Sequence, residues 1–175
     1  LSGGGTILSG QGTTGVDVLW GATPGTYTLS VTASNGCGTS TATTTTVTVN
    51  PPAPIITSTI AGDADVCPGT EVYSIANTAN ATDYTWTLSS GGSIVSGAGT
   101  NSVSVTWTTP GTHTLSVTAN NACGASTAAT INVTVNPAPT VPQVITSDQT
   151  ICEGEQVTHV CNLANIPTFE VIVGS

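Results

Sequence analysis

The sequence predicts an all-β protein made of antiparallel β-sandwich repeats in tandem. Apolar and polar residues alternate over short segments rich in Val and Thr, which is typical of half-buried strands. The 20 glycines and 10 prolines interrupt these segments, and no segment has the apolar spacing of a helix. A long stretch of the sequence also recurs after about 86 residues, which fits a self-contained sandwich of about seven strands.

The clearest sign of the repeat is a motif found at residues 24–38 and again at 110–124. The first copy reads PGTYTLSVTASNGCG and the second PGTHTLSVTANNACG, so twelve of fifteen positions are identical. Trp20 and Trp107 precede the two copies, and Pro51 and Pro137 follow them. Each copy predicts a Pro-Gly turn, a strand with apolar residues at alternate positions, and a polar turn that ends in Cys-Gly.

This spacing divides the chain into three parts. Residues 51–136 are predicted to be a complete repeat, residues 1–50 the C-terminal part of one before it, and residues 137–175 the N-terminal part of a third. The opening LSGGGTILSG aligns with LSSGGSIVSG at 88–97, inside a repeat. We therefore expect the chain to be an excerpt of a longer protein.

Seven strands are expected in the complete repeat, separated by turn residues. They cover residues 55–60, 71–76, 83–88, 94–95, 102–107, 112–119 and 128–135. In the third of these strands Tyr84, Trp86 and Leu88 share one face, because side chains alternate across a strand. We expect Trp86 to fill the core.

Proline-rich segments stand at the boundaries between the parts. Residues 50–54 read NPPAP and residues 136–142 read NPAPTVP. Such segments favour an extended conformation of about 3.1 Å per residue and act as semi-rigid spacers. A strand-terminating loop is the simpler alternative, but recurrence at each boundary favours the spacer, and spaced sandwiches would form a rod.

Composition excludes several functions. The chain has no Lys or Arg, 9 Asp or Glu and a formal net charge of −9. Without cations it cannot neutralise phosphates, so nucleic acid is excluded as a direct partner, and so is a basic patch for anionic lipid. No apolar run reaches the roughly 18 residues that a membrane-spanning helix needs, so direct membrane insertion is not expected.

The cysteines are the most specific chemical signal. In the complete repeat, Cys67 precedes the second strand and Cys123 follows the sixth, and we predict that they form a disulfide. Cys37 and Cys152, their counterparts in the flanking parts, would then pair with partners outside this chain. Metal ligation and buried free thiols are the alternatives; zinc is disfavoured because no CxxC pair is present. A disulfide would indicate an oxidising, extracellular compartment, and Cys161 falls outside the pattern.

Aromatic and histidine residues give weaker signals. Trp20 and Trp107 each end a strand beside a Pro-Gly turn, where partial exposure would allow them to stack on a ligand such as a sugar. His113 aligns with Tyr27, and an exchange of Tyr for His argues against a catalytic histidine. His159 has no nucleophile or acid that spacing could assign to it. We identify no catalytic residues.

Asp63 and Asp65 form the one acidic cluster with plausible geometry for a cation. Calcium takes six to eight oxygen ligands and often sits in loops between domains. The cluster does not recur in the third part of the chain, where residues 147–149 read SDQ. Solvated loop acids are the more ordinary interpretation, and no metal or other cofactor is expected.

Together these segments resemble a known family. The YTW of the third strand, SGAGTNSVSVTW, PGTHTLSVTANNACG and the CPGT at 67–70 resemble the PKD-like, Ig-like tandem repeats of Bacteroidota surface proteins, including gliding adhesins exported by the type 9 secretion system. The resemblance implies Ig-like sandwiches in an extracellular filament, without catalytic residues to transfer. The WDFGDG-like signature of true PKD domains is missing.

The function expected from these observations is structural. The chain would be a stalk segment of a cell-surface adhesin or filament, used for attachment or gliding motility. Its partners would be neighbouring repeats of the same chain, and also surface polysaccharide or other cell-surface proteins. Two alternatives stay open: a carbohydrate-binding module, with Trp20 and Trp107 as platforms, and an accessory domain of a secreted hydrolase.

Overall fold

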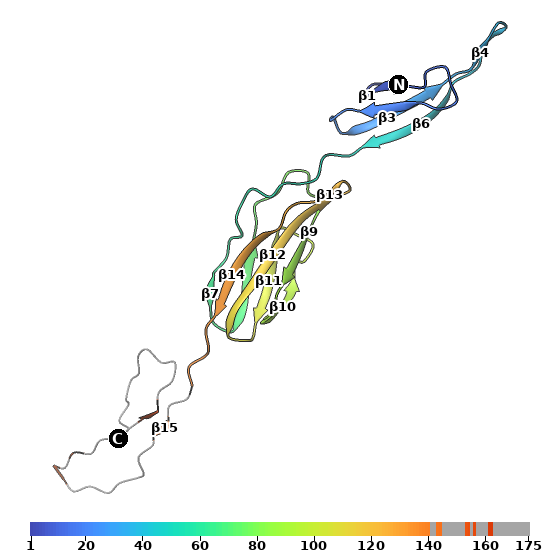
Figure 1. Cartoon of the computed structure of the whole chain (residues 1–175). Helices are drawn as coiled ribbons and strands as arrows, with labels where there is room; N and C mark the ends of the chain where they lie inside the picture. The colour runs from blue at the N-terminus through green and yellow to red at the C-terminus, as the bar shows by residue number, and fades with distance from the viewer. Residues whose placement is uncertain (141–142, 145–152, 155, 157–160, 163–175) are drawn as a thin grey trace.

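The structure, a computed structural model, describes residues 1–140, 143–144, 153–154, 156 and 161–162. Throughout this part of the chain the regular elements are strands, as predicted. Figure 1 shows a sandwich in the middle of the chain, which we call the central sandwich (residues 51–136), and smaller sheets at the N-terminal end, where residues 1–50 form three two-stranded sheets. We call this second group the N-terminal sheets (residues 1–50).

The central sandwich consists of two sheets. One contains, in spatial order, β10 (Gly92–Ser96), β11 (Ser102–Trp107) and β8 (Gly69–Ser74). The other contains β13 (Gly124–Ala125), β12 (Gly111–Asn121), β14 (Ala129–Val135) and β7 (Asp65–Val66), while β9 (Asp83–Leu88) pairs with β12. All these pairings are antiparallel except that of β7 with β14, which is parallel. The predicted Ig-like antiparallel sandwich is confirmed.

Alternate side chains of both sheets meet in one core. The strand β11 contributes Val103, Val105 and Trp107, all at most 1 % exposed, and β12 contributes Leu115 and Val117 in the same way. Trp86 is also buried, as expected from its strand face. All the buried members of this core, and the apolar residues packed against them, belong to residues 56–135, so the central sandwich contains a complete core of its own.

The N-terminal sheets reproduce half of this arrangement. The pair β1 (Gly5–Ser9) and β2 (Asp17–Trp20) corresponds to β10 and β11, down to a bulge at the equivalent place, Ile7/Ser9 against Ile94/Ser96. The pair β3 (Gly25–Val31) and β6 (Thr43–Val49) corresponds to β12 and β14, and β4 (Ser34–Asn35) with β5 (Gly38–Thr39) forms the turn.

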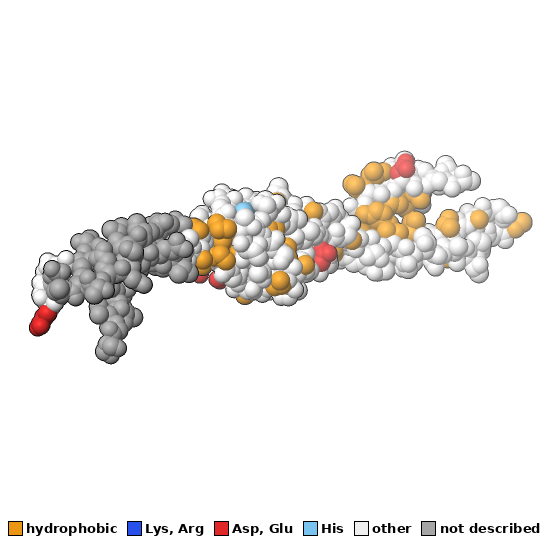
Figure 2. Space-filling view, turned by 90° about the horizontal axis from the view of Figure 1, so that it is seen from below, with side chains coloured by type: hydrophobic (Ala, Val, Ile, Leu, Met, Phe, Trp, Pro, Cys, Tyr) orange, Lys and Arg blue, Asp and Glu red, His pale blue; other side chains and the backbone are white. Residues whose placement is uncertain are grey.

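Among the described residues, no counterparts of β8 and β9 pair with the N-terminal sheets, and equivalent residues of the two parts differ in burial. Val117 is 1 % exposed in the central sandwich, whereas Val31, its counterpart in the repeated motif, is 65 % exposed. Leu8 and Leu19 are exposed as well. Figure 2 shows apolar side chains gathered between the lobes of the N-terminal sheets.

Two details differ from the predicted strands. Residues 55–60 were expected to form a strand, but they run without ladder pairing up to the bridge between Ala61 and Ser74. The edge position is taken instead by β7, two residues long and parallel to β14. In the third part, β15 (Gln143–Val144) and β16 (Cys161–Asn162) pair in an antiparallel manner.

Candidate functional site

The residues with distinctive contacts lie at the two ends of the central sandwich, where the chain enters and leaves it. At the first end, the β12–β13 turn contacts the linker from the N-terminal sheets. Asn121 donates from Nδ2 to the carbonyl oxygens of Pro52 at 2.7 Å and Pro51 at 3.3 Å. It also donates to the carbonyl of Asn80 at 3.1 Å. One side chain thus ties the linker to two loops of the sandwich.

The same asparagine shapes the turn that carries Cys123. Its Oδ1 accepts a hydrogen bond from the backbone N–H of Cys123 at 2.8 Å. Asn35 makes the equivalent bond to the N–H of Cys37 at 2.9 Å. The two motif copies therefore share the Asn-to-Cys spacing because each Asn forms an Asx turn, in which its side chain accepts from the backbone N–H two residues later.

At the opposite end, Asn136 fixes the point where the chain leaves. Its backbone N–H donates to the carbonyl of Val66 at 2.8 Å, and its side-chain amide donates to Oδ1 of Asp65. Cys67 follows directly after this bonded segment. Cys67 therefore lies beside the linker that leaves the sandwich, and Cys123 lies beside the linker that enters it.

The predicted disulfide between Cys67 and Cys123 is wrong for this structure: both cysteines are free and exposed. The reason is strand direction. Trp107 pairs with Gly69, so β8 begins at the end where β11 finishes and β12 begins. Cys123 follows the far end of β12, an 11-residue strand about 35 Å long. A disulfide requires Cα atoms within about 7 Å.

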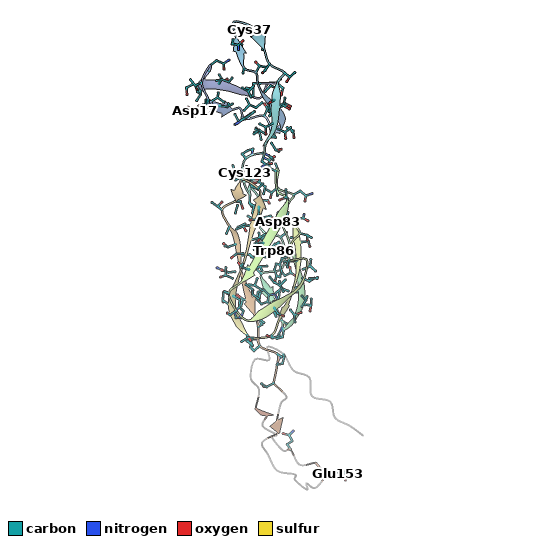
Figure 3. The ribbon with its side chains drawn as sticks, turned by 90° about the vertical axis from the view of Figure 1, so that its right-hand side faces the viewer. Asp17, Cys37, Asp83, Trp86, Cys123 and Glu153 are labelled. Atoms are coloured by element: carbon teal, nitrogen blue, oxygen red, sulfur yellow. The ribbon has the colours of Figure 1, made fainter. Side chains whose placement is uncertain are left out.

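The remaining cysteines are Cys37, Cys152 and Cys161. Cys37 is free and exposed at the tip of the β4–β5 hairpin, and Figure 3 shows it at the far end of the N-terminal sheets, while Cys123 faces the linker. Cys152 lies outside the described residues. Cys161 is described only as part of β16.

Trp107 cannot serve as the ligand-stacking platform that the sequence suggested, because it is 1 % exposed. Its ring meets Tyr73 edge-on, with centroids 6.2 Å apart, and its Nε1 donates to the Tyr73 hydroxyl at 3.1 Å. Trp20 is half-buried and stacks on Tyr27, with centroids 5.9 Å apart. Its greater exposure follows from the open N-terminal sheets, and its ring holds the place that Trp107 holds in the central sandwich.

His113 has a packing role that the exchange with Tyr27 explains. Its ring stacks on Trp107 at 5.7 Å, as Tyr27 stacks on Trp20. The carbonyl of Thr109 accepts a hydrogen bond from His113 Nε2 at 2.9 Å, and the carbonyl of Thr23 accepts one from the Tyr27 hydroxyl at 2.9 Å. Both residues therefore offer a flat ring and a donor to the carbonyl four residues earlier.

We predict that His113→Tyr changes the free energy of unfolding of the central sandwich by less than about 1 kcal/mol, because ring and donor are both retained. His113→Leu should cost about 1–3 kcal/mol, because it removes both the ring that stacks on Trp107 and the donor to the Thr109 carbonyl. Urea denaturation of residues 51–136 measures both. Equal losses of stability in the two variants would contradict the equivalence of His113 and Tyr27.

Tyr73 is the most deeply buried polar side chain of the sandwich. It is 0 % exposed, donates to the carbonyl of Asp63 at 2.9 Å and accepts from Trp107. Burial raises the pKa of Tyr73, and the charges of Glu71 and Asp63 raise it further, while the Trp107 hydrogen bond lowers it. The phenol therefore keeps its proton in the folded state beyond the pH at which an exposed tyrosine ionises.

The sign of this pKa shift predicts alkaline destabilisation. Below about pH 10, the ordinary tyrosine pKa, both states hold the proton and the stability is fully present. Above it the unfolded state releases the proton first, so the free energy of unfolding falls as pH rises. Urea midpoints at about pH 9 and 11 should therefore differ less in Tyr73→Phe than in the parent. If the urea midpoint changes equally in both proteins, groups other than Tyr73 cause the alkaline destabilisation.

The candidate calcium ligands have structural partners. Asp65 accepts from Asn136 within the exit contact, and the backbone carbonyl of Asp63 accepts from Tyr73. Among the described residues, no group of three or more His, Cys, Asp or Glu side chains is placed to hold a metal ion. Calcium at this pair stays the alternative to the solvated loop acids that the sequence favours.

Comparison with known families identifies the chain. The PKD-like domain matches residues 1–47 and again residues 52–133, which is well over half of the sequence. The chain therefore belongs to the PKD-like domain family. Domains of this kind are typically extracellular and non-catalytic, which is consistent with a structural or adhesive role.

No curated protein matches the chain. The described residues also contain no helix long and apolar enough to cross a membrane.

Sequence reasoning missed the contacts made by Asn121 and Asn136. Both asparagines recur one period apart, as Asn35 and Asn50 in the first part of the chain. Because these polar residues recur beside each linker, the repeat itself could have indicated that they form contacts there. Tyr73 was recognised only as a strand residue, because nothing in its local sequence shows that its hydroxyl bridges a tryptophan and a loop carbonyl.

Proposed function

We propose that the chain is a stalk segment, a spacer that extends an adhesive or motile surface filament away from the cell. The observation that carries this proposal is the position of the two ends. The chain arrives at one end of the central sandwich, where Asn121 binds the linker carbonyls, and leaves at the other, where Asn136 bonds to β7. Units built in this way add their lengths (Figure 1).

A more specific form of the proposal comes from the resemblance of the sequence to the tandem repeats of Bacteroidota surface proteins. It places the stalk in a cell-surface adhesin of the kind that Bacteroidota export through the type 9 secretion system, with neighbouring repeats as its first partners. The cation-free surface supports this proposal, because a chain of one charge sign repels other copies at a distance. Adhesion itself would belong to other parts of the filament.

The test is the length of tandem arrays of residues 51–136. We expect the maximum dimension from small-angle X-ray scattering to rise by a constant increment between one, two and four copies. A flexibly jointed chain would instead grow as roughly the square root of the number of units. Square-root growth in the parent array would contradict a stalk.

Asn121→Ala in every copy should shift the array toward flexible growth, because the linker loses its two carbonyl contacts. Asn132→Ala is the matched control: its side chain, on the exposed face of β14, accepts a hydrogen bond from Thr114 of β12, and among the described residues no side-chain hydrogen bond joins it to a linker. Arrays with Asn132→Ala should keep the constant increment. An equal effect of both changes would mean that Asn121 does not stiffen the linker.

A further inference from the structure

The two cysteines of the central sandwich occupy opposite ends, and each lies beside a linker. Cys123 sits in the turn whose Asn121 binds Pro51 and Pro52, and the neighbouring Gly124 lies against Ala53. Cys67 follows Val66, whose carbonyl accepts from the N–H of Asn136. Both thiols are exposed. Each exposed thiol therefore lies at one end of the central sandwich, beside the linker at that end.

Tandem repetition brings these two ends together. The linker after the central sandwich repeats the linker before it, since Asn136-Pro137 answers Asn50-Pro51 one period later. A following unit of the same fold would hold its own turn cysteine beside residues 137–138, as Cys123 is held beside Pro51 and Pro52. Cys67 lies beside Asn136. Only one or two linker residues separate the two positions along the axis, about 3–6 Å in an extended segment.

We propose that the cysteines form disulfides between consecutive units, joining Cys67 of one unit to the Cys123 position of the next. The axial gap is compatible with the Cα separation of about 4.4–6.8 Å that a disulfide requires, whereas the separation within one unit is not. The inference rests on the proposed function, because it requires units in tandem. It makes each junction a covalently closed loop, which locks the linker.

The chemistry requires an oxidant, and a small disulfide such as oxidised glutathione supplies it. The Cys67 thiolate attacks one glutathione sulfur, forms a mixed disulfide and releases one glutathione thiolate. The Cys123 thiolate of the next unit then attacks the Cys67 sulfur and releases the second. The two protons lost by the protein thiols end on the two glutathione thiols, so protein dithiol and oxidised glutathione give protein disulfide and two reduced glutathiones.

The experiment uses two copies of residues 51–136 joined directly, which recreates the Asn-Pro junction; the complete core within this segment allows each copy to fold. The junction variant carries Cys123→Ser in the first copy and Cys67→Ser in the second, so only the two thiols at the junction remain. The control variant carries Cys67→Ser in the first copy and Cys123→Ser in the second. It keeps only the two thiols at the outer ends of the tandem. Serine is tolerated because both sites are exposed.

In a glutathione redox buffer we expect the junction variant to form one intramolecular disulfide, seen as the loss of two hydrogen atoms by mass spectrometry. Its effective thiol concentration should exceed that of the control by at least about a hundredfold, as for groups held close by a short linker. Equal oxidation of the two variants, or only intermolecular bonds in the junction variant, would overturn the proposal.

Scattering from a tandem with all four cysteines replaced by serine separates this inference from the stalk. If that protein stays extended while the junction variant forms no bond, the disulfide is refuted and the stalk stands. If it folds back on itself while the junction variant does oxidise, the bond is supported and the linker alone does not stiffen the stalk.

Discussion

Trp107→Ala is expected to destabilise the central sandwich by about 3–5 kcal/mol, the usual cost of removing a fully buried aromatic ring. Trp107 is 1 % exposed, packs edge-on against Tyr73 and stacks on His113. Its loss also leaves the Tyr73 hydroxyl without its Nε1 donor. Because domains of this size have only about 5–15 kcal/mol of stability, part of the population should be unfolded at 37 °C.

Urea denaturation of the 175-residue chain, followed by the NMR signal of the Trp86 indole N–H, which is resolved from those of the other tryptophans, measures this effect. Trp20→Ala is the matched control, because the equivalent ring is half-buried in the N-terminal sheets and lies outside the core that contains Trp86. We expect it to leave the Trp86 transition unchanged. Similar midpoints for the two variants would show that Trp107 is not central to the core.

Gly91→Ala is expected to cost about 2–4 kcal/mol for two independent reasons. Gly91 has a φ of +81°, a left-handed conformation that costs a residue with a Cβ about 1–2 kcal/mol. A Cβ built there would also overlap the His113 imidazole, and overpacking costs about 1–3 kcal/mol. Gly4, at the equivalent position, has a φ of +70° and lies in the same way against the Tyr27 ring.

Gly99→Ala is the control for this substitution, because a Cβ there meets nothing within 4 Å and its φ is not left-handed. We expect a change below about 0.5 kcal/mol, as for ordinary surface substitutions. Combining Gly91→Ala with His113→Ser should cost less than the sum of the single changes, because the smaller side chain removes the overlap. Strict additivity would show that the backbone conformation alone accounts for the loss.

Strict alternation made the central strands of this fold predictable. The expected strands at 83–88 and 102–107 agree with β9 and β11 residue for residue. Alternation also contained the signal that Trp107 is buried, since it is in phase with Val103 and Val105 on the core face. The neighbouring Pro-Gly turn suggested exposure instead, and the phase of the strand proved the better guide.

Elements without alternation could not be predicted in the same way. The strand β7 has two residues, and its parallel pairing with β14 depends on contacts far apart in the sequence. The disulfide prediction failed for a related reason. Sequence spacing gives the distance along the chain, whereas the end of the sandwich at which Cys67 lies depends on the pairing of Gly69 with Trp107.

The parallel contact between β7 and β14 has a mechanical consequence. When a filament is pulled, tension reaches the central sandwich through residue 51 at one end and residue 136 at the other, so β7 and β14 are drawn in opposite directions along their length. The bonds from the N–H of Thr134 to the Ala64 carbonyl and from the N–H of Asn136 to the Val66 carbonyl lie across this direction. They share the load in shear and must rupture together, whereas a hairpin opened from its tip would lose its bonds one by one.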